Sequence, residues 1–233
     1  MLDEEAPAPA RTIHAHGLQK KVNLISGRKI SGVNQTESML ESNIVVAAHV
    51  DPRVIKIEAQ PLTFDLRSGH EYASKSELHA LKQPRGYRPW IYTPDFRVTL
   101  RDGSRILVEG KHTSWLKQNP EFDRVLIAVG DLGHRITLVT ETLFSSSLVR
   151  NLRLLKPLTG SRDETLGPSV QGLKAGGPVR AAKLLSSGMS QRSLFLTLLS
   201  GRLRCDLAAQ PLGPSTLVEL GDGSTTHLEV LPL

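Results

Sequence analysis

The sequence predicts an α/β protein in which a mixed sheet is flanked by helices, followed by a small C-terminal module of helices and strands. An amphipathic stretch at residues 36–50 comes first, and a strand–turn–strand pattern covers residues 96–108. Two further apolar runs, at residues 124–129 and 135–140, read as strands. Helical and strand periods therefore follow one another within a single region, which is the pattern of a layered α/β domain.

The first predicted element is a helix from Thr36 to about Val50. Thr36 has a side chain suited to the N-cap position. A stripe at helical spacing follows, formed by Glu41, Ile44, Val45 and Ala48. Glu41 is its only charged member, so it is either an edge residue that reaches for solvent or part of a polar site. Glu37, one turn earlier, is assigned to capping or to solvent.

The second predicted element is a β-hairpin. Phe96 to Leu100 alternates apolar and polar side chains, and Arg105 to Val108 returns as an apolar-rich strand. Between them lies Arg-Asp-Gly-Ser, in which Gly103 accepts a positive φ at low cost.

Three charged residues are predicted to converge at one end of this hairpin. Asp95 comes just before the first strand, while Glu109 and Lys111 are two residues apart and project from the same face of the second. Burying such a cluster uncompensated is costly, but carboxylates that ligate Mg²⁺ are neutralised by it, and Mg²⁺ prefers oxygen ligands. The alternative is an ordinary exposed hairpin whose charges are solvated.

These residues resemble the PD-(D/E)xK nuclease superfamily, in which Pro-Asp precedes acid-x-Lys on adjacent strands. Here the two motifs are Pro94-Asp95 and Glu109-Gly110-Lys111. The resemblance implies a restriction-endonuclease-like fold.

The upstream motifs narrow the resemblance. The chain reads Glu-Ser-Met-Leu-Glu at residues 37–41, Asp-Pro-Arg-Val at 51–54 and Gln-Pro at 60–61, and it ends the pattern with Asn-Leu-Arg-Leu-Leu at 151–155. In this order the motifs are similar to those of TnsA-type endonuclease subunits of Tn7-like heteromeric transposases. The similarity covers residues 36–156, the predicted nuclease domain.

The resemblance implies a metal-dependent endonuclease that hydrolyses phosphodiesters of double-stranded DNA. Its implied catalytic set is Glu41, Asp95, Glu109 and Lys111. The three carboxylates, with the carbonyl of Gly110, would hold one or two Mg²⁺ ions, and Mn²⁺ is a possible substitute. Lys111 would orient water or stabilise the charge that develops on the phosphate. Gly110 departs from the pattern, since a β-branched residue suits a central strand better.

The implied partners are a DDE-type transposase, which would cut the 3′ ends of the transposon while this subunit cuts the 5′ ends, and a AAA+ ATPase regulator. Two alternatives stay open. One is a free-standing phage or restriction-like nuclease with the same core, and the other is a nuclease-fold adaptor that binds DNA or protein without cleaving.

The remaining segments complete the predicted organisation. Residues 1–35 form an N-terminal tail, residues 157–179 a linker rich in Gly, Pro and Ser, and residues 180–233 a winged-helix-like domain. The last is predicted from two helices, Val179–Ser187 and Gln191–Leu199, and from three strands at Leu203–Leu207, Ser215–Leu220 and Leu228–Leu231. Residues 62–91 interleave basic and aromatic side chains, which suits either a DNA-contacting loop or a solvated excursion with one buried Trp.

Composition limits the class of protein. The chain has 29 Lys and Arg against 23 Asp and Glu, a net charge of +6, which favours a polyanionic partner over a small acidic substrate. A single cysteine, Cys205, excludes an internal disulfide and is predicted to be a small core residue. The sequence has no long apolar run or signal peptide, so we expect no membrane association and a cytoplasmic location.

Overall fold

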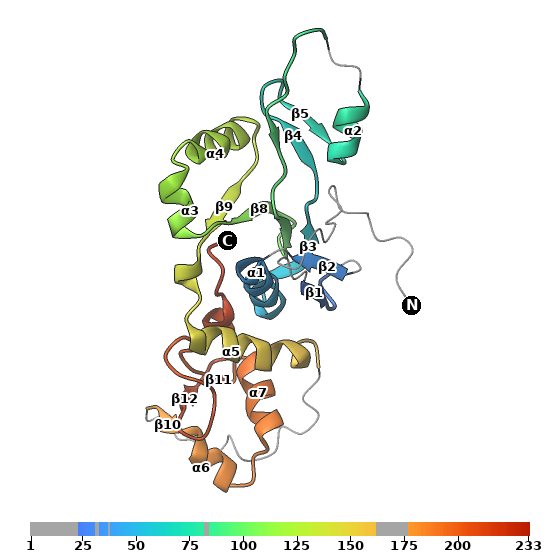
Figure 1. Ribbon diagram of the computed structural model, residues 1–233. Helices are drawn as coiled ribbons and strands as arrows, with labels where there is room; N and C mark the ends of the chain where they lie inside the picture. Colours follow the sequence, from blue (N-terminus) through green and yellow to red (C-terminus); the bar gives the residue numbers. More distant parts are fainter. Residues whose placement is uncertain (1–22, 31–32, 37, 82–83, 162–176) are drawn as a thin grey trace. The chain divides into compact units, whose positions relative to one another are not determined.

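The structure is a computed structural model that describes residues 23–30, 33–36, 38–81, 84–161 and 177–233 (Figure 1). Contacts divide the chain into two compact units. The first comprises Met1–Ala48, Arg53–Leu143 and Pro232–Leu233, and the second His49–Pro52 and Phe144–Leu231. The first unit is mixed α/β with a mixed sheet flanked by helices, which confirms the coarse fold class.

A four-stranded sheet forms the centre of the first unit, in the order β3-β7-β8-β9. Its strands are β3 Val54–Ala59, β7 Phe96–Leu100, β8 Arg105–Gly110 and β9 Ile136–Val139. Neighbours are antiparallel from β3 to β8, whereas β9 is parallel to β8. The predicted β7–β8 hairpin is confirmed, with Gly103 at φ 84° in its turn.

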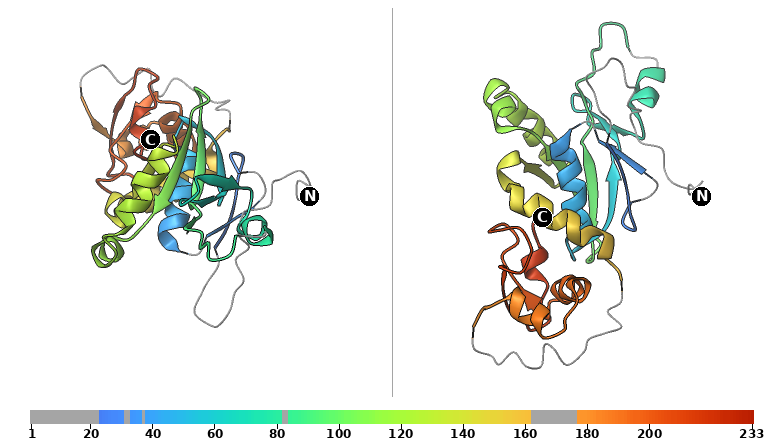
Figure 2. Two further views of the ribbon diagram at one scale, coloured as in Figure 1. Left: turned by 90° about the horizontal axis from the view of Figure 1, so that it is seen from above. Right: turned by 60° about the horizontal axis from the view of Figure 1, so that its bottom comes forward.

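Helices cover both faces of this sheet (Figure 2). Helix α1, Met39–Val50, lies on the face that carries Gly110, because Leu40 and Ile44 would be the nearest neighbours of a side chain there. Helix α4, Phe122–Asp131, packs on the opposite face through a cluster that includes Leu107 of β8, and the short helix α3, Thr113–Gln118, adds Leu116 to it. The end of β8 is thus enclosed between helices.

The strand predicted at residues 124–129 is wrong, because this segment lies within α4. The β-branched content of Val-Leu-Ile-Ala-Val suggested a strand. The deciding pattern is longer: Phe122, Leu126 and Val129 recur at helical spacing and pack together in the core. The strand predicted at 135–140 is confirmed as β9.

The start of α1 also differs from the prediction. Thr36 is the last residue of β2, Val33–Thr36, which pairs with β1, Asn23–Ser26, so part of the predicted tail is a hairpin. The hydroxyl of Ser38 accepts a hydrogen bond from the backbone N–H of Glu41 at 3.1 Å, so Ser38 caps the helix in place of Thr36. The assignment of Glu37 lies outside the described residues.

The segment at residues 62–91 is a small folded subdomain. It contains β4 Thr63–Asp65, β5 His70–Tyr72, α2 Lys75–Ala80 and β6 Ile91–Tyr92, with strand order β5-β4-β6. Trp90 is 38% exposed, so the predicted excursion with a buried Trp is wrong in that detail.

The second unit contains α5 Ser146–Leu155, α6 Ala181–Ser186, α7 Gln191–Leu199 and a small antiparallel sheet ordered β10-β12-β11. The strands are β10 Val179–Arg180, β11 Leu203–Arg204 and β12 Leu217–Leu220. Short 3-10 turns cover Glu141–Leu143 in the first unit, and Lys156–Leu158 and Thr226–Leu228 in the second.

Helix α5, predicted as the end of the nuclease domain, belongs to this second unit. The buried amide of Asn151 donates to the carbonyls of Leu207 and Gln210 and accepts from the N–H of Leu212. Most of the linker predicted at 157–179 lies outside the described residues.

Two further predictions for the second unit differ. Val179 lies in a strand, and α6 begins only at Ala181. The strand predicted at Leu228–Leu231 is absent from the described structure, where a 3-10 turn reaches Leu228 instead. In the described part of the chain, no helix has both the length and the apolar character needed to span a membrane.

Candidate active site

Asp95, Glu109 and Lys111 meet at one end of the β7–β8 hairpin, as predicted. The Lys111 Nζ lies 2.5 Å from Glu109 Oε1 and 3.8 Å from Asp95 Oδ2. Asp95 immediately precedes β7, Glu109 lies in β8, and Lys111 follows β8 directly. The two strands therefore deliver two carboxylates to a single cation.

Glu109 is the most deeply buried member, at 2% exposure. Its Oε2 accepts hydrogen bonds from the Tyr92 hydroxyl at 2.8 Å and from the backbone N–H of Asp95 at 3.0 Å. These donors replace part of the water that a carboxylate loses on burial, and the Lys111 ammonium neutralises the other oxygen. Burial and the charge of Glu109 also raise the pKa of the Tyr92 hydroxyl, so it remains a donor.

Asp95 is held by the strand opposite. Its Oδ2 accepts a hydrogen bond from the backbone N–H of Gly110 at 2.9 Å. Burial, followed by the charge of Glu109, raises the pKa of Asp95 to about 8, although Lys111 and the Gly110 amide act in the opposite direction. Asp95 therefore binds a proton more readily than an ordinary aspartate does.

Lys111 is surrounded by both charge and aromatic rings. Burial lowers its pKa, but the charges of Asp95 and Glu109 outweigh burial and raise the pKa overall, so the ammonium stays protonated. Its Nζ also lies 5.6 Å from the ring centroid of Trp115 and 5.8 Å from that of Phe122. Both distances are within the range of cation–π attraction.

Glu41, the third predicted ligand, lies in the first turn of α1 and is partly buried. Its Oε1 accepts a hydrogen bond from the Ser38 hydroxyl at 3.0 Å. Its charge contributes to raising the pKa of Asp95 and of Lys111. Glu41 is therefore close enough to influence the cluster electrostatically, and its role as a metal ligand stays a prediction.

Packing against α1 explains why glycine occupies position 110. A Cβ there would lie 2.8 Å from Cδ1 of Ile44, 3.5 Å from Cγ of Leu40 and 3.7 Å from Oδ2 of Asp95. The γ atoms of a β-branched residue would extend still further into α1 and clash with it. Glycine lets the helix approach the sheet beside the carboxylates.

The donor set suits a hard divalent cation. Two carboxylates converge on one cationic group, and carboxylate oxygens are the ligands that Mg²⁺ prefers. Within the described residues, no three His, Cys, Asp or Glu side chains are grouped so as to hold a metal ion. A metal at this position would use Asp95 and Glu109, whose charge Lys111 partly neutralises here, and Glu41 and the Gly110 carbonyl are the further predicted ligands.

Two residues at this site escaped sequence reasoning. Tyr92 lies three positions before Asp95, and only the hydrogen bond from its hydroxyl to Glu109 shows that it belongs to the site. Gln60 donates its backbone N–H to the carbonyl of Asp95 at 2.8 Å and has φ 44°, which is unfavourable for a residue other than glycine. The Gln-Pro motif at residues 60–61 was the one feature of the sequence that pointed to Gln60.

A buried carboxylate, Asp65, organises the subdomain at residues 62–91. It accepts hydrogen bonds from the hydroxyls of Tyr87 and Ser68 and from the backbone N–H groups of Trp90 and Arg67. Burial raises the pKa of Asp65, but these hydrogen bonds outweigh it and lower the pKa overall. Several basic side chains of the subdomain are exposed: Arg67, Lys75, Arg85 and Arg88.

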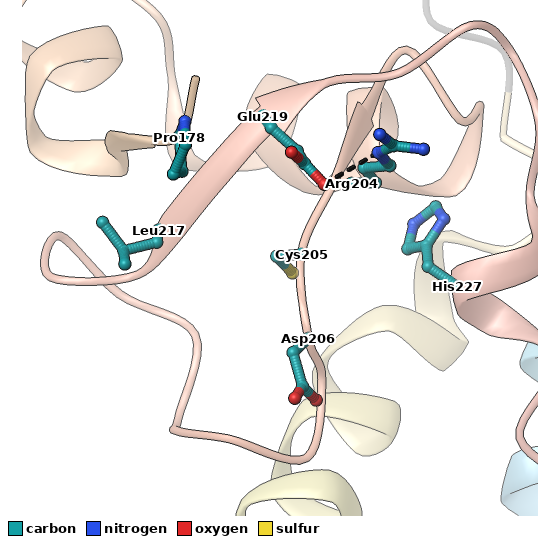
Figure 3. A pocket seen from close by; sticks show the side chains of 7 residues that line it. All are labelled: Pro178, Arg204, Cys205, Asp206, Leu217, Glu219 and His227. Carbon is teal, nitrogen blue, oxygen red and sulfur yellow. Dashed lines mark ion pairs between the residues drawn. The ribbon is translucent and has the colours of Figure 1, made fainter.

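The second unit has a cavity of about 390 Å³ (Figure 3). It is lined by Pro178, Arg204, Cys205, Asp206, Leu217, Glu219 and His227. Two of its three charged residues already pair, with Arg204 Nε 2.8 Å from Glu219 Oε1. Cys205 is partly rather than fully buried, and burial raises the pKa of its thiol to about 12, which keeps the thiol protonated and unreactive. The cavity therefore lacks a pair of carboxylates around one ammonium like that of the hairpin cluster.

A comparison with protein-family models and with curated protein sequences gives no match. The residues of the hairpin cluster and the motif resemblance therefore remain the grounds for assigning a function.

Proposed function

We propose that this protein is a Mg²⁺-dependent DNA endonuclease, a phosphodiester hydrolase of the PD-(D/E)xK type. The observation that carries the proposal is the convergence of Asp95 and Glu109 on the ammonium of Lys111 at one end of the β7–β8 hairpin. The antiparallel β3-β7-β8 sheet with β9 parallel to β8, and α1 against it, supports a restriction-endonuclease-like core.

The side chains have distinct roles in this proposal. Asp95 and Glu109, with Glu41 and the Gly110 carbonyl, would hold the metal, and Mn²⁺ could replace Mg²⁺. The bound metal supplies Lewis acidity for the phosphoryl oxygen and lowers the pKa of water. Tyr92 fixes the orientation of Glu109 through its hydroxyl. Lys111 stabilises the negative charge that develops on the phosphate.

By its motifs the endonuclease is of the TnsA type, cutting the 5′ ends of a transposon beside a DDE-type transposase and under a AAA+ ATPase regulator. Residues 180–233 are proposed as a winged-helix-like module that contacts a protein partner. Its helix pair α6–α7 and three-stranded sheet support this assignment.

The test is Mn²⁺ binding by calorimetry, with cleavage of plasmid DNA measured alongside. We expect wild type to bind Mn²⁺ and both Asp95→Asn and Glu109→Gln to lose binding. Asp102→Asn is the matched control, because Asp102 lies in the turn of the same hairpin and only shapes that turn through Ser104. Failure of wild type to bind Mn²⁺ even with DNA present would reject the nuclease and favour the non-cleaving adaptor.

A further inference from the structure

Trp115 is an exposed aromatic side chain beside the candidate active site. The residue is 37% exposed, although Lys111 Nζ lies 5.6 Å from the centroid of its ring. Lys111 is shared with the carboxylate cluster, since the same Nζ lies 2.5 Å from Glu109 Oε1. Successive nucleotides of a duplex are spaced about 3.4 Å along its axis, so the ring lies only a few nucleotides from these carboxylates.

Trp115 is not a core residue, because α3 lies at the surface. No residue of α3 is buried. The ring packs nearly perpendicular to Phe122, with centroids 5.3 Å apart and an interplanar angle of 81°. The N-terminus of α3 is tied down by Glu141, which accepts hydrogen bonds from the backbone N–H and the hydroxyl of Thr113. Trp115 is thus held in place from several sides while more than a third of it stays accessible.

We propose that Trp115 is a stacking subsite for a nucleobase that flanks the scissile phosphate, which rests on the nuclease function proposed above. Every nucleobase has a π-face, so stacking on an indole tolerates any sequence. A base that stacks on a protein ring must leave its neighbours in the duplex. The subsite therefore favours DNA with an unpaired or partly unstacked base at the cut.

The chain provides a specific optical test, because its two tryptophans are Trp90 and Trp115. The variant Trp90→Phe leaves Trp115 as the only indole. We expect its fluorescence to be quenched saturably by a short oligodeoxythymidylate without any divalent metal. The same backbone with abasic sites in place of the bases should bind without this quenching.

Affinity is measured separately by anisotropy of a fluorescein-labelled oligodeoxythymidylate. We expect Trp115→Ala to weaken binding about tenfold and Trp115→Phe to restore most of it. Trp115→Ala also loses the contact with Phe122, so thermal denaturation of each variant checks that it is folded at the temperature of the binding assay.

The outcomes separate this inference from the proposed function. Unquenched Trp115 fluorescence, or equal affinity of wild type and Trp115→Ala, overturns the subsite even if Mg²⁺-dependent cleavage is observed. Quenching together with weaker binding by Trp115→Ala supports base stacking on Trp115. The absence of cleavage would then reject the nuclease and the position of this base beside a scissile phosphate, but not the stacking itself. Failure of wild type to bind the oligonucleotide overturns the subsite as well.

Discussion

Gly110→Ala tests whether α1 dictates glycine between Glu109 and Lys111. The new methyl group would lie 2.8 Å from Cδ1 of Ile44, whereas carbon atoms attract best at about 3.5–4.0 Å. Ile44 is fully buried, so its side chain has little room to move away. Overpacking of this kind costs about 1–3 kcal/mol. Relief of the entropic cost of glycine in a strand returns about 0.5–1 kcal/mol.

We therefore expect Gly110→Ala to lower the free energy of unfolding by about 0.5–2 kcal/mol. Ile44→Val removes the clashing Cδ1 and should cost about 0.5–1.5 kcal/mol alone. In the double variant the added methyl meets no clash, so the two effects should not add. Urea denaturation of wild type, the two single variants and the double variant gives the coupling free energy between positions 44 and 110. We expect it to make the double variant about 1 kcal/mol more stable than the sum of the single effects predicts.

Gly130→Ala is the control. Gly130 lies within α4, and a Cβ there would meet no atom within 4 Å. Alanine should therefore raise the free energy of unfolding, by about 0.5–1 kcal/mol, through helix propensity alone. If Gly110→Ala were equally stabilising, or if it showed no coupling to Ile44→Val, the packing explanation for Gly110 would be refuted.

Three further changes test other parts of the structure. Asp65→Asn should destabilise the subdomain at 62–91 by about 1–3 kcal/mol, measured as faster hydrogen exchange of the Trp90 amide, and unchanged exchange would contradict the role of Asp65. Because folding lowers the pKa of Asp65, the wild-type protein should lose the same protection as the pH falls through the folded pKa. Asn151→Ala leaves buried backbone groups, including the Leu212 N–H, without partners and should destabilise the second unit by about 3–5 kcal/mol in thermal denaturation. A loss of stability below about 1 kcal/mol would show that water replaces the Asn151 amide. Gln60→Gly should stabilise by up to about 1 kcal/mol in urea denaturation because φ 44° suits glycine, whereas Gln60→Val should destabilise, and the opposite order would refute the strain.

Local patterns of the sequence were enough to predict the hairpin and its charges. A period of two places alternate side chains on one face, and a glycine in the turn sets the register, so Asp95, Glu109 and Lys111 could be placed at one end from the chain alone. The long-range position of Glu41 could be predicted only by motif resemblance, and its contact with Ser38 is local capping that the spacing also allows.

Tertiary structure decided the features that depend on residues distant in the chain. The segment around Val129 is a helix because its apolar positions meet the Leu107 face of the sheet, although its residue types also suit a strand. Likewise, Gly110 is required by α1, whose Ile44 and Leu40 lie more than sixty positions earlier in the chain. Sequence periodicity indicates which face of an element is buried, but not which other element will cover it.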